Sequence, residues 1–175
     1  MQKVDESLLE VNPVARFRWV AEFMGFEESD EAALHTAAPL VAPMVPGLVD
    51  AVYERLFAWS SVKRHLAGYL VALVTRPYDA AMVQFLDRVG AMHTPRAGSP
   101  ALFVPLVQMN ALMGFVSDAV LQAVLSLSLE RAAEVRTLRA FNKLLWLQND
   151  LITRHYQGLD SSQALPPGEQ VQTGG

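Results

Sequence analysis

One histidine stands where its imidazole could do chemistry. The stretch VGAMHTPRAGSP, residues 89–100, sets His93 in apolar surroundings, directly before Thr94-Pro95 and a turn rich in Gly and Pro. Helical spacing puts His93 on the inward face, four residues after Val89. Because the last carbonyls of a helix have no intrahelical partner, one of them could accept the Nδ1 proton. The Nε2 nitrogen would then be free to bind a metal.

The rest of the chain limits which metal group this histidine could serve. The sequence has 4 histidines and no cysteine, and no other histidine stands at ligand spacing from His93. A protein-built zinc site needs several such ligands, and thiolate sites, iron–sulfur clusters, disulfides and c-type haem all need cysteine. A macrocycle that already supplies four nitrogens needs only one protein ligand. Haem therefore suits a lone inward histidine, and the alternative is a hydrogen-bonded core histidine without a chemical role.

The composition indicates a protein with apolar surface to cover. Hydrophobic residues make up 51% of the 175 residues and charged residues 18%, with a net charge of −4. This excess of apolar residues predicts a partner: a cofactor, a second subunit or a membrane. Lys and Arg are scattered without a basic stripe, so nucleic-acid binding is not expected.

The N-terminus, the lack of cysteine and the polar residues within 101–129 argue against a membrane protein and for a cytoplasmic one. The N-terminus has early acidic residues and no apolar signal segment, and the lack of cysteine fits a reducing compartment. Polar residues recur along residues 101–129, so we expect a buried helix of a soluble protein there, not a membrane span.

Helical periodicity recurs along the chain and predicts an all-α domain. Residues 1–12 are expected to form an N-terminal arm, 13–158 the domain, and 159–175 a disordered tail rich in Pro and Gly. Helices are expected at 13–24, from a cap at Ser29 or Asp30 to about 41, after Pro46, at about 61–75, from near Pro77 to 93, at about 100–125 and at about 129–157. Pro43 and Pro46 are expected to break the chain between the second and third of these helices.

The last two of these helices carry more apolar surface than one core needs. The first of them is apolar almost all round. We therefore expect the pair to form a four-helix bundle with a second copy of the chain, giving a homodimer.

Four segments together resemble one known family. They are ARFRWVAEFMGFEESDEAAL, LVDAVYERLF, TRPYDAAMVQFLDRVGAMHTPRAG and VPLVQMNALMGFVSDAV, and they look like the protoglobin and globin-coupled-sensor family over residues 14–157. The VG-x-x-H-T element before a Gly/Pro turn is the most specific part. The resemblance implies a globin-like fold with an extra N-terminal helix. It also implies a non-covalent haem b whose proximal iron ligand is His93.

The resemblance assigns further residues around the haem. The D-x-x-Y setting of the family corresponds to LVDAVY, which puts Tyr53 over the opposite haem face as a hydrogen-bond donor to dioxygen. A core tyrosine is the alternative. Where archaeal protoglobins have a Trp-Tyr pair, this chain has Val52 before Tyr53. Phe57, Leu73 and Val89 are expected haem contacts, with core packing as the other interpretation of Phe57.

What the resemblance implies about function is reversible binding of O2, CO or NO. The chain would be either a free-standing protoglobin-like protein, which could signal to a separate partner, or an excised sensor domain. Two alternatives remain open. A haem enzyme acting on peroxide, NO or nitrite is one, although peroxidases generally need a distal acid–base group such as histidine and only Tyr53 is expected on that side. A haem-free globin-like interaction module is the other, which His93 disfavours.

Overall fold

The computed structural model describes residues 6–56, 60–95 and 104–159, without the side chains of residues 6, 53, 55–56 and 60–65. Over these ranges the chain is helical and contains no strand, so the predicted all-α class is confirmed. The α-helices are α1 (Glu6–Val11), α2 (Pro13–Met24), α3 (Glu28–Val41), α4 (Val45–Leu56), α5 (Ser60–Thr75), α6 (Ala80–Met92), α7 (Leu106–Ser126) and α8 (Arg131–Thr153). Two short 3-10 turns, η1 (Ala42–Met44) and η4 (Arg154–Tyr156), follow α3 and α8.

The ends of α2 follow from its sequence. Pro13 takes the first helical position, where a missing N–H costs nothing, and the Asn12 side chain accepts hydrogen bonds from the amides of Val14 and Ala15. The helix stops at Gly25, which has a φ of 62°. That left-handed conformation strains most side chains, so glycine ends the helix here at little cost. The predicted range 13–24 is confirmed.

The predicted start of α6 at Pro77 is wrong. The helix begins at Ala80, and Asp79 precedes it as the capping residue, with its carboxylate accepting the amide of Met82 at 2.9 Å. A capping carboxylate satisfies an amide that has no intrahelical partner, and proline offers no such acceptor. The chain therefore stays outside helical geometry at Pro77 and enters the helix only after Asp79.

The break after α3 is smaller than the prolines predict. Pro43 lies within the single 3-10 turn η1, and Pro46 falls in the first turn of α4, where proline is tolerated. The start of α3 also differs from the prediction. Glu27 caps it instead of Ser29 or Asp30, and the Asp30 carboxylate accepts the amide of Glu27 at 3.0 Å.

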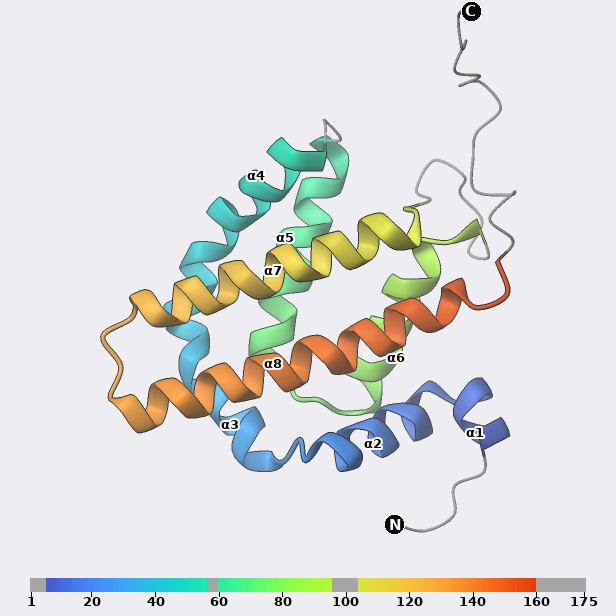
Figure 1. Cartoon of the computed structure of the whole chain (residues 1–175), viewed down its shortest axis with the longest axis horizontal. Helices are drawn as coiled ribbons and strands as arrows, with labels where there is room; N and C mark the ends of the chain where they lie inside the picture. The colour runs from blue at the N-terminus through green and yellow to red at the C-terminus, as the bar shows by residue number, and fades with distance from the viewer. Residues whose placement is uncertain (1–5, 57–59, 96–103, 160–175) are drawn as a thin grey trace, which may run out of the picture.

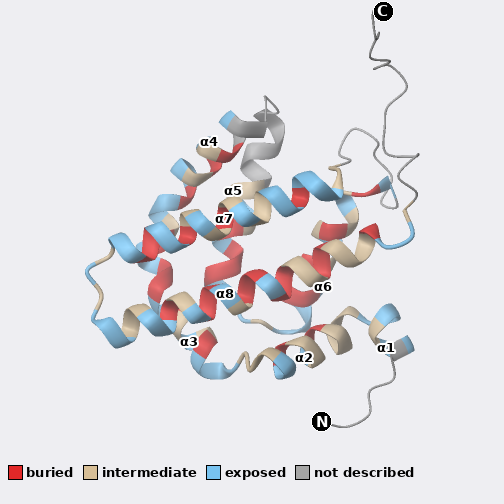
Figure 2. Ribbon diagram, in the orientation of Figure 1, coloured by how far each residue is buried: buried red, intermediate tan, exposed pale blue. Residues whose placement is uncertain are grey.

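Helix α8 organises the packing. It crosses the molecule and packs against α3, α7, α6 and α2, as Figure 1 shows. Its inward face is largely buried in Figure 2, and the largest fully buried core side chains come from three helices. These are Leu34 of α3, Leu86 of α6, and Leu144, Leu147 and Leu151 of α8.

Helices α7 and α8 keep apolar side chains on the surface. They run side by side on one face of the molecule (Figure 1), and large exposed hydrophobic side chains lie along both. These are Leu106, Val107, Leu121 and Leu125 on α7, and Val135 and Trp146 on α8. The prediction that the first of these helices is apolar almost all round is confirmed, whereas the prediction of a buried helix holds for one face only.

By length and composition, two described segments could cross a membrane: Glu28–Val52 and Leu106–Ser126. Helices α3 and α7, which lie in these segments, pack against α8 in this fold.

Candidate functional site

His93 lies at the C-terminal end of α6, one residue beyond its last helical position. Its φ and ψ are −86° and 2°, so the chain leaves helical geometry there. The Nδ1–H donates to the carbonyl of Val89 at 2.7 Å, which is the kind of hydrogen bond predicted for a histidine at a helix end. Because a carbonyl can only accept, Nδ1 carries a proton, and in the neutral form of the ring the lone pair is on Nε2. Among the described residues Nε2 has no hydrogen-bond partner.

Gly90 allows α6 to lie directly against α8. A Cβ at this position would stand 2.7 Å from the Cα of Ile152 and 3.0 Å from the carbonyl oxygen of Leu151. Any other residue would force the two backbones apart, because these atoms cannot rotate out of the way. The glycine of the VG-x-x-H-T element therefore sets the height of α6, and of His93 at its end, above α8.

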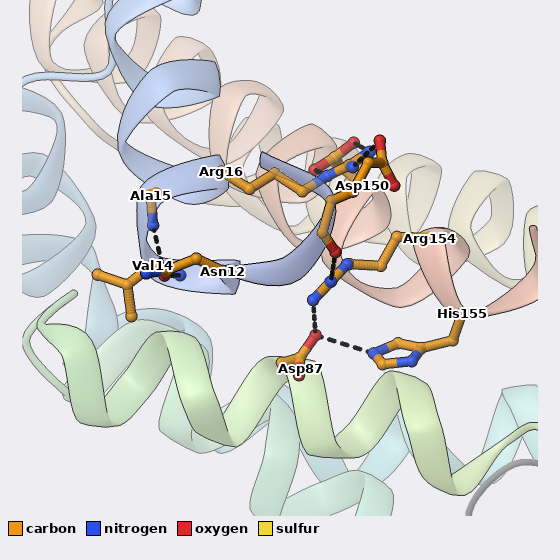
Figure 3. A network of polar contacts seen from close by, with 9 residues as sticks. Asn12, Val14, Ala15, Arg16, Asp87, Asp150, Arg154 and His155 are labelled. Carbon is orange, nitrogen blue, oxygen red and sulfur yellow. Dashed lines mark hydrogen bonds and ion pairs between the residues drawn. The ribbon is translucent and has the colours of Figure 1, made fainter. Parts of the chain in front are cut away.

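A polar network secures α6 one turn earlier. The Asp87 carboxylate accepts from the Arg154 guanidinium at 2.6 Å and from Nε2 of His155 at 2.8 Å, as Figure 3 shows. Arg154 also donates to the backbone carbonyl of Glu10 in α1. The three side chains are mostly shielded from solvent, with exposed fractions of 12–21%. Shielding of this kind strengthens charge-assisted hydrogen bonds.

A second apolar cluster lies beside the backbone of His93. Its buried members are Met109 of α7, Ile152 of α8 and Tyr156 of η4, and Val104 packs against them. The Val104 amide donates to the His93 carbonyl at 3.0 Å, and the Tyr156 hydroxyl donates to the Val104 carbonyl at 2.7 Å. Burial raises the pKa of Tyr156 to about 12, so its phenol remains a donor at neutral pH.

Helix α5 reaches the same cluster through Tyr69. The Tyr69 hydroxyl donates to Oε1 of Gln148 at 2.5 Å, and its ring centroid lies 6.1 Å from that of Phe85 in α6. Burial raises the pKa of Tyr69 strongly, so the phenol stays neutral. Side chains of α5, α6, α7 and α8 thus meet around the end of the helix that carries His93.

Sequence reasoning did not identify this cluster or the partners of Asp87. Their residue types are those of any helical core or ion pair, and they come from distant parts of the chain. The one local signal was the glycine of the VG-x-x-H-T element, but its close contact with α8 becomes visible only once the two helices are packed.

The other residues predicted for the site have different outcomes. Val89 is half-buried and supplies the carbonyl that orients His93. Leu73 is 3% exposed and belongs to the main core. Tyr53 falls within α4, but its side chain, like the whole of Phe57, lies outside the described residues. Their roles at a haem stay predictions.

A separate groove of about 550 Å³ runs between α2, the start of α3 and the start of α6. Phe17, Phe26 and Tyr78 form part of its lining, and none of the predicted site residues does. It is therefore not the site that His93 serves.

Comparisons with known proteins place this geometry in a family. The family model described as Protoglobin matches residues 14–160. The chain belongs to the protoglobin family. The fold of this protoglobin is similar to that of the globin domain of the Geobacter sulfurreducens globin-coupled sensor, with a TM-score of 0.71. The two are 18% identical over 80% of this chain and 97% of that one, a likeness that shows a globin fold. No curated protein matches the chain.

Proposed function

We propose that this protoglobin binds haem b non-covalently and, through it, reversibly binds a diatomic gas, O2, CO or NO. The observation that carries the proposal is the hydrogen bond from Nδ1 of His93 to the Val89 carbonyl at 2.7 Å. It fixes the tautomer and the ring orientation that an iron ligand needs and leaves Nε2 to the metal. Haem supplies the other four nitrogens and the open coordination position for the gas.

The surroundings of His93 suit such a group. The second apolar cluster of Met109, Ile152 and Tyr156, with Tyr69 and Val104 packed on it, offers an apolar wall beside the histidine. Apolar walls exclude water and favour a large flat macrocycle, which binds mainly by burial. The family match adds independent support, because the residues that it covers include His93.

The roles of the remaining predicted residues belong to the same proposal. Val89 would contact the haem on the side of His93, and Leu73 and Phe57 would contact it from α5 and the segment before it. Tyr53 would offer its phenol as a hydrogen-bond donor to the gas on the opposite face. The family resemblance supports the assignment of Tyr53, and Phe57 follows it by one helical turn in the sequence.

Spectroscopy of histidine variants tests the proposal. The purified chain, reconstituted with haem, should show an intense Soret band and the spectrum of a five-coordinate ferrous histidine complex. His93→Ala should lose the histidine signature, and added imidazole should restore it. His35→Ala is the matched control, because His35 also bonds a backbone carbonyl, that of Arg76 at 3.1 Å, but on another helix. A His93→Ala spectrum like that of the wild type would remove His93 from the iron.

We further propose that the exposed apolar side chains of α7 and α8 pack against a second copy of the chain. Six large hydrophobic side chains are exposed along these two neighbouring helices, and exposed apolar surface commonly marks a site of protein–protein contact. A cytoplasmic homodimer that reports gas binding to a signalling partner agrees with this surface and with the sensor-type fold.

A further inference from the structure

Three consecutive residues at the end of α8 each bind the part of the chain that carries His93. Arg154 and His155 bond the carboxylate of Asp87, six residues before His93 on α6. Tyr156 donates to the Val104 carbonyl at 2.7 Å and lies 3.5 Å from the His93 carbonyl. The turn η4 therefore holds α6 in its middle and also holds the backbone at His93 itself.

Between Asp87 and His93, helix α6 lies in direct contact with the backbone of α8. Gly90 lies midway between Asp87 and His93, and there the α6 backbone meets Ile152 of α8 at a distance that leaves no room for a Cβ. Fixed points spread over two turns of a helix restrain both its translation and its rotation about its own axis. Because the imidazole is attached at the end of α6, its height and its orientation are restrained as well.

Arg154 and the nearby Asp150 also bind the N-terminal helices α1 and α2. Arg154, which binds Asp87 in Figure 3, also donates to the carbonyl of Glu10 in α1. One turn earlier on α8, Asp150 accepts two hydrogen bonds from Arg16 of α2, at 2.7 and 2.8 Å. A displacement of α6 would thus strain bonds that reach α1.

We propose that the turn Arg154–Tyr156 is a positioning element for His93, which sets the height and the rotation of the imidazole and couples it to α1. This inference rests on the proposed function for its haem part. Coupling of this kind is reciprocal. A change at the turn alters how His93 binds iron, and gas binding that moves His93 alters the exposure of the turn and of α1.

Two pairs of variants separate positioning from general stability. Asp87→Asn removes the negative charge that Arg154 and His155 bind and so weakens both bonds, and Tyr156→Phe removes the hydroxyl that bonds Val104. Both variants keep the side-chain shape. Asp30→Asn is the control for the first, because it breaks an equally shielded ion pair, with Lys143, that joins α8 to α3 and not to α6. Tyr78→Phe is the control for the second, because Tyr78 also donates to a backbone carbonyl, that of Leu73.

The first measurement needs no haem. Hydrogen exchange of the Val104 amide in the full chain reports the bond to the His93 carbonyl. We expect exchange to be about fivefold faster in Asp87→Asn and Tyr156→Phe, the effect of losing one ordinary hydrogen bond, and unchanged in both controls. The two test variants change different atoms. If one of them does not fold, the other still tests the proposal.

The second measurement uses the haem-loaded protein. The iron–histidine stretching band of the ferrous form should shift, and haem loss should be about tenfold faster, in the two test variants alone. Asp87→Glu should restore the band in part, because it returns the carboxylate.

Equal effects in the test and control variants would overturn the proposal, and so would an unchanged Val104 exchange rate in both test variants. If the wild type takes up no haem, the proposed function fails, and the exchange measurement alone then decides whether the turn positions His93.

Discussion

Replacing Gly90 by alanine probes the contact on which the geometry of the site depends. The new Cβ would stand 2.7 Å from the Cα of Ile152, 2.9 Å from Cδ2 of His155 and 3.0 Å from the carbonyl oxygen of Leu151. Non-bonded carbon atoms pack at about 3.5–4.0 Å, so α6 and α8 must separate by about 1 Å. Two of the three atoms are backbone atoms, which cannot swing aside.

Two opposing contributions set the change in the free energy of unfolding of Gly90→Ala. Overpacking of this kind costs about 1–3 kcal/mol, whereas removing a glycine from a helix interior gains about 1 kcal/mol. In Gly68→Ala on α5 only the gain from removing the glycine is expected, because no atom of the described residues lies within 4 Å of the added Cβ. The two variants should therefore differ by about 1–3 kcal/mol in their free energy of unfolding, with Gly90→Ala the less stable.

Urea denaturation followed by circular dichroism measures this difference, with equal protein concentrations and with m-values compared to confirm like transitions. The Gly90→Ala protein should also hold haem less tightly than Gly68→Ala, since its α6 is displaced. If Gly90→Ala proves as stable as Gly68→Ala, α6 does not lie on the α8 backbone, and the account of how His93 is placed is refuted.

Three further predictions address the distal side, the acid stability and the dimer. Tyr53→Phe should release O2 about tenfold faster in stopped-flow experiments, the loss of a hydrogen bond worth about 1.4 kcal/mol, and an unchanged rate would exclude Tyr53 from contact with the gas. Hydrogen bonds from the amides of Ala132 and Ala133 lower the pKa of Glu130, so its stabilisation of α8 is present above the ordinary value of 4.5 and is lost as the pH falls through the lower folded value. Thermal melts should therefore show a lower Tm for Glu130→Ala than for the wild type at neutral pH, and a smaller fall in Tm below pH 4.5. An equal fall in Tm for the two proteins would contradict this. Trp146, 60% exposed on α8, should be central to the dimer, so Trp146→Lys should lower the mass in sedimentation from dimer to monomer, and an unchanged mass would place the interface elsewhere.

Much of the fold could be predicted because helix ends are local. Pro13 and Gly25 bracket α2 as expected, since each acts through its own backbone conformation. The start of α6 was harder, because Pro77 and Asp79 are both good starting signals two residues apart. Only the hydrogen bond that the Asp79 side chain forms decides between them.

The same distinction between local and long-range contacts applies to the candidate site. By itself the sequence predicts an imidazole at a helix end, where one of the last carbonyls can accept its Nδ1 proton. The structure identifies that acceptor as the Val89 carbonyl, one helical turn earlier. Only the tertiary structure decided what holds that helix in place. Asp87 meets its partner Arg154 across 67 residues, and Tyr156 meets Val104 across 52. Such pairs depend on how α6 and α8 pack, and no local pattern of residues encodes a contact between segments so far apart in the chain.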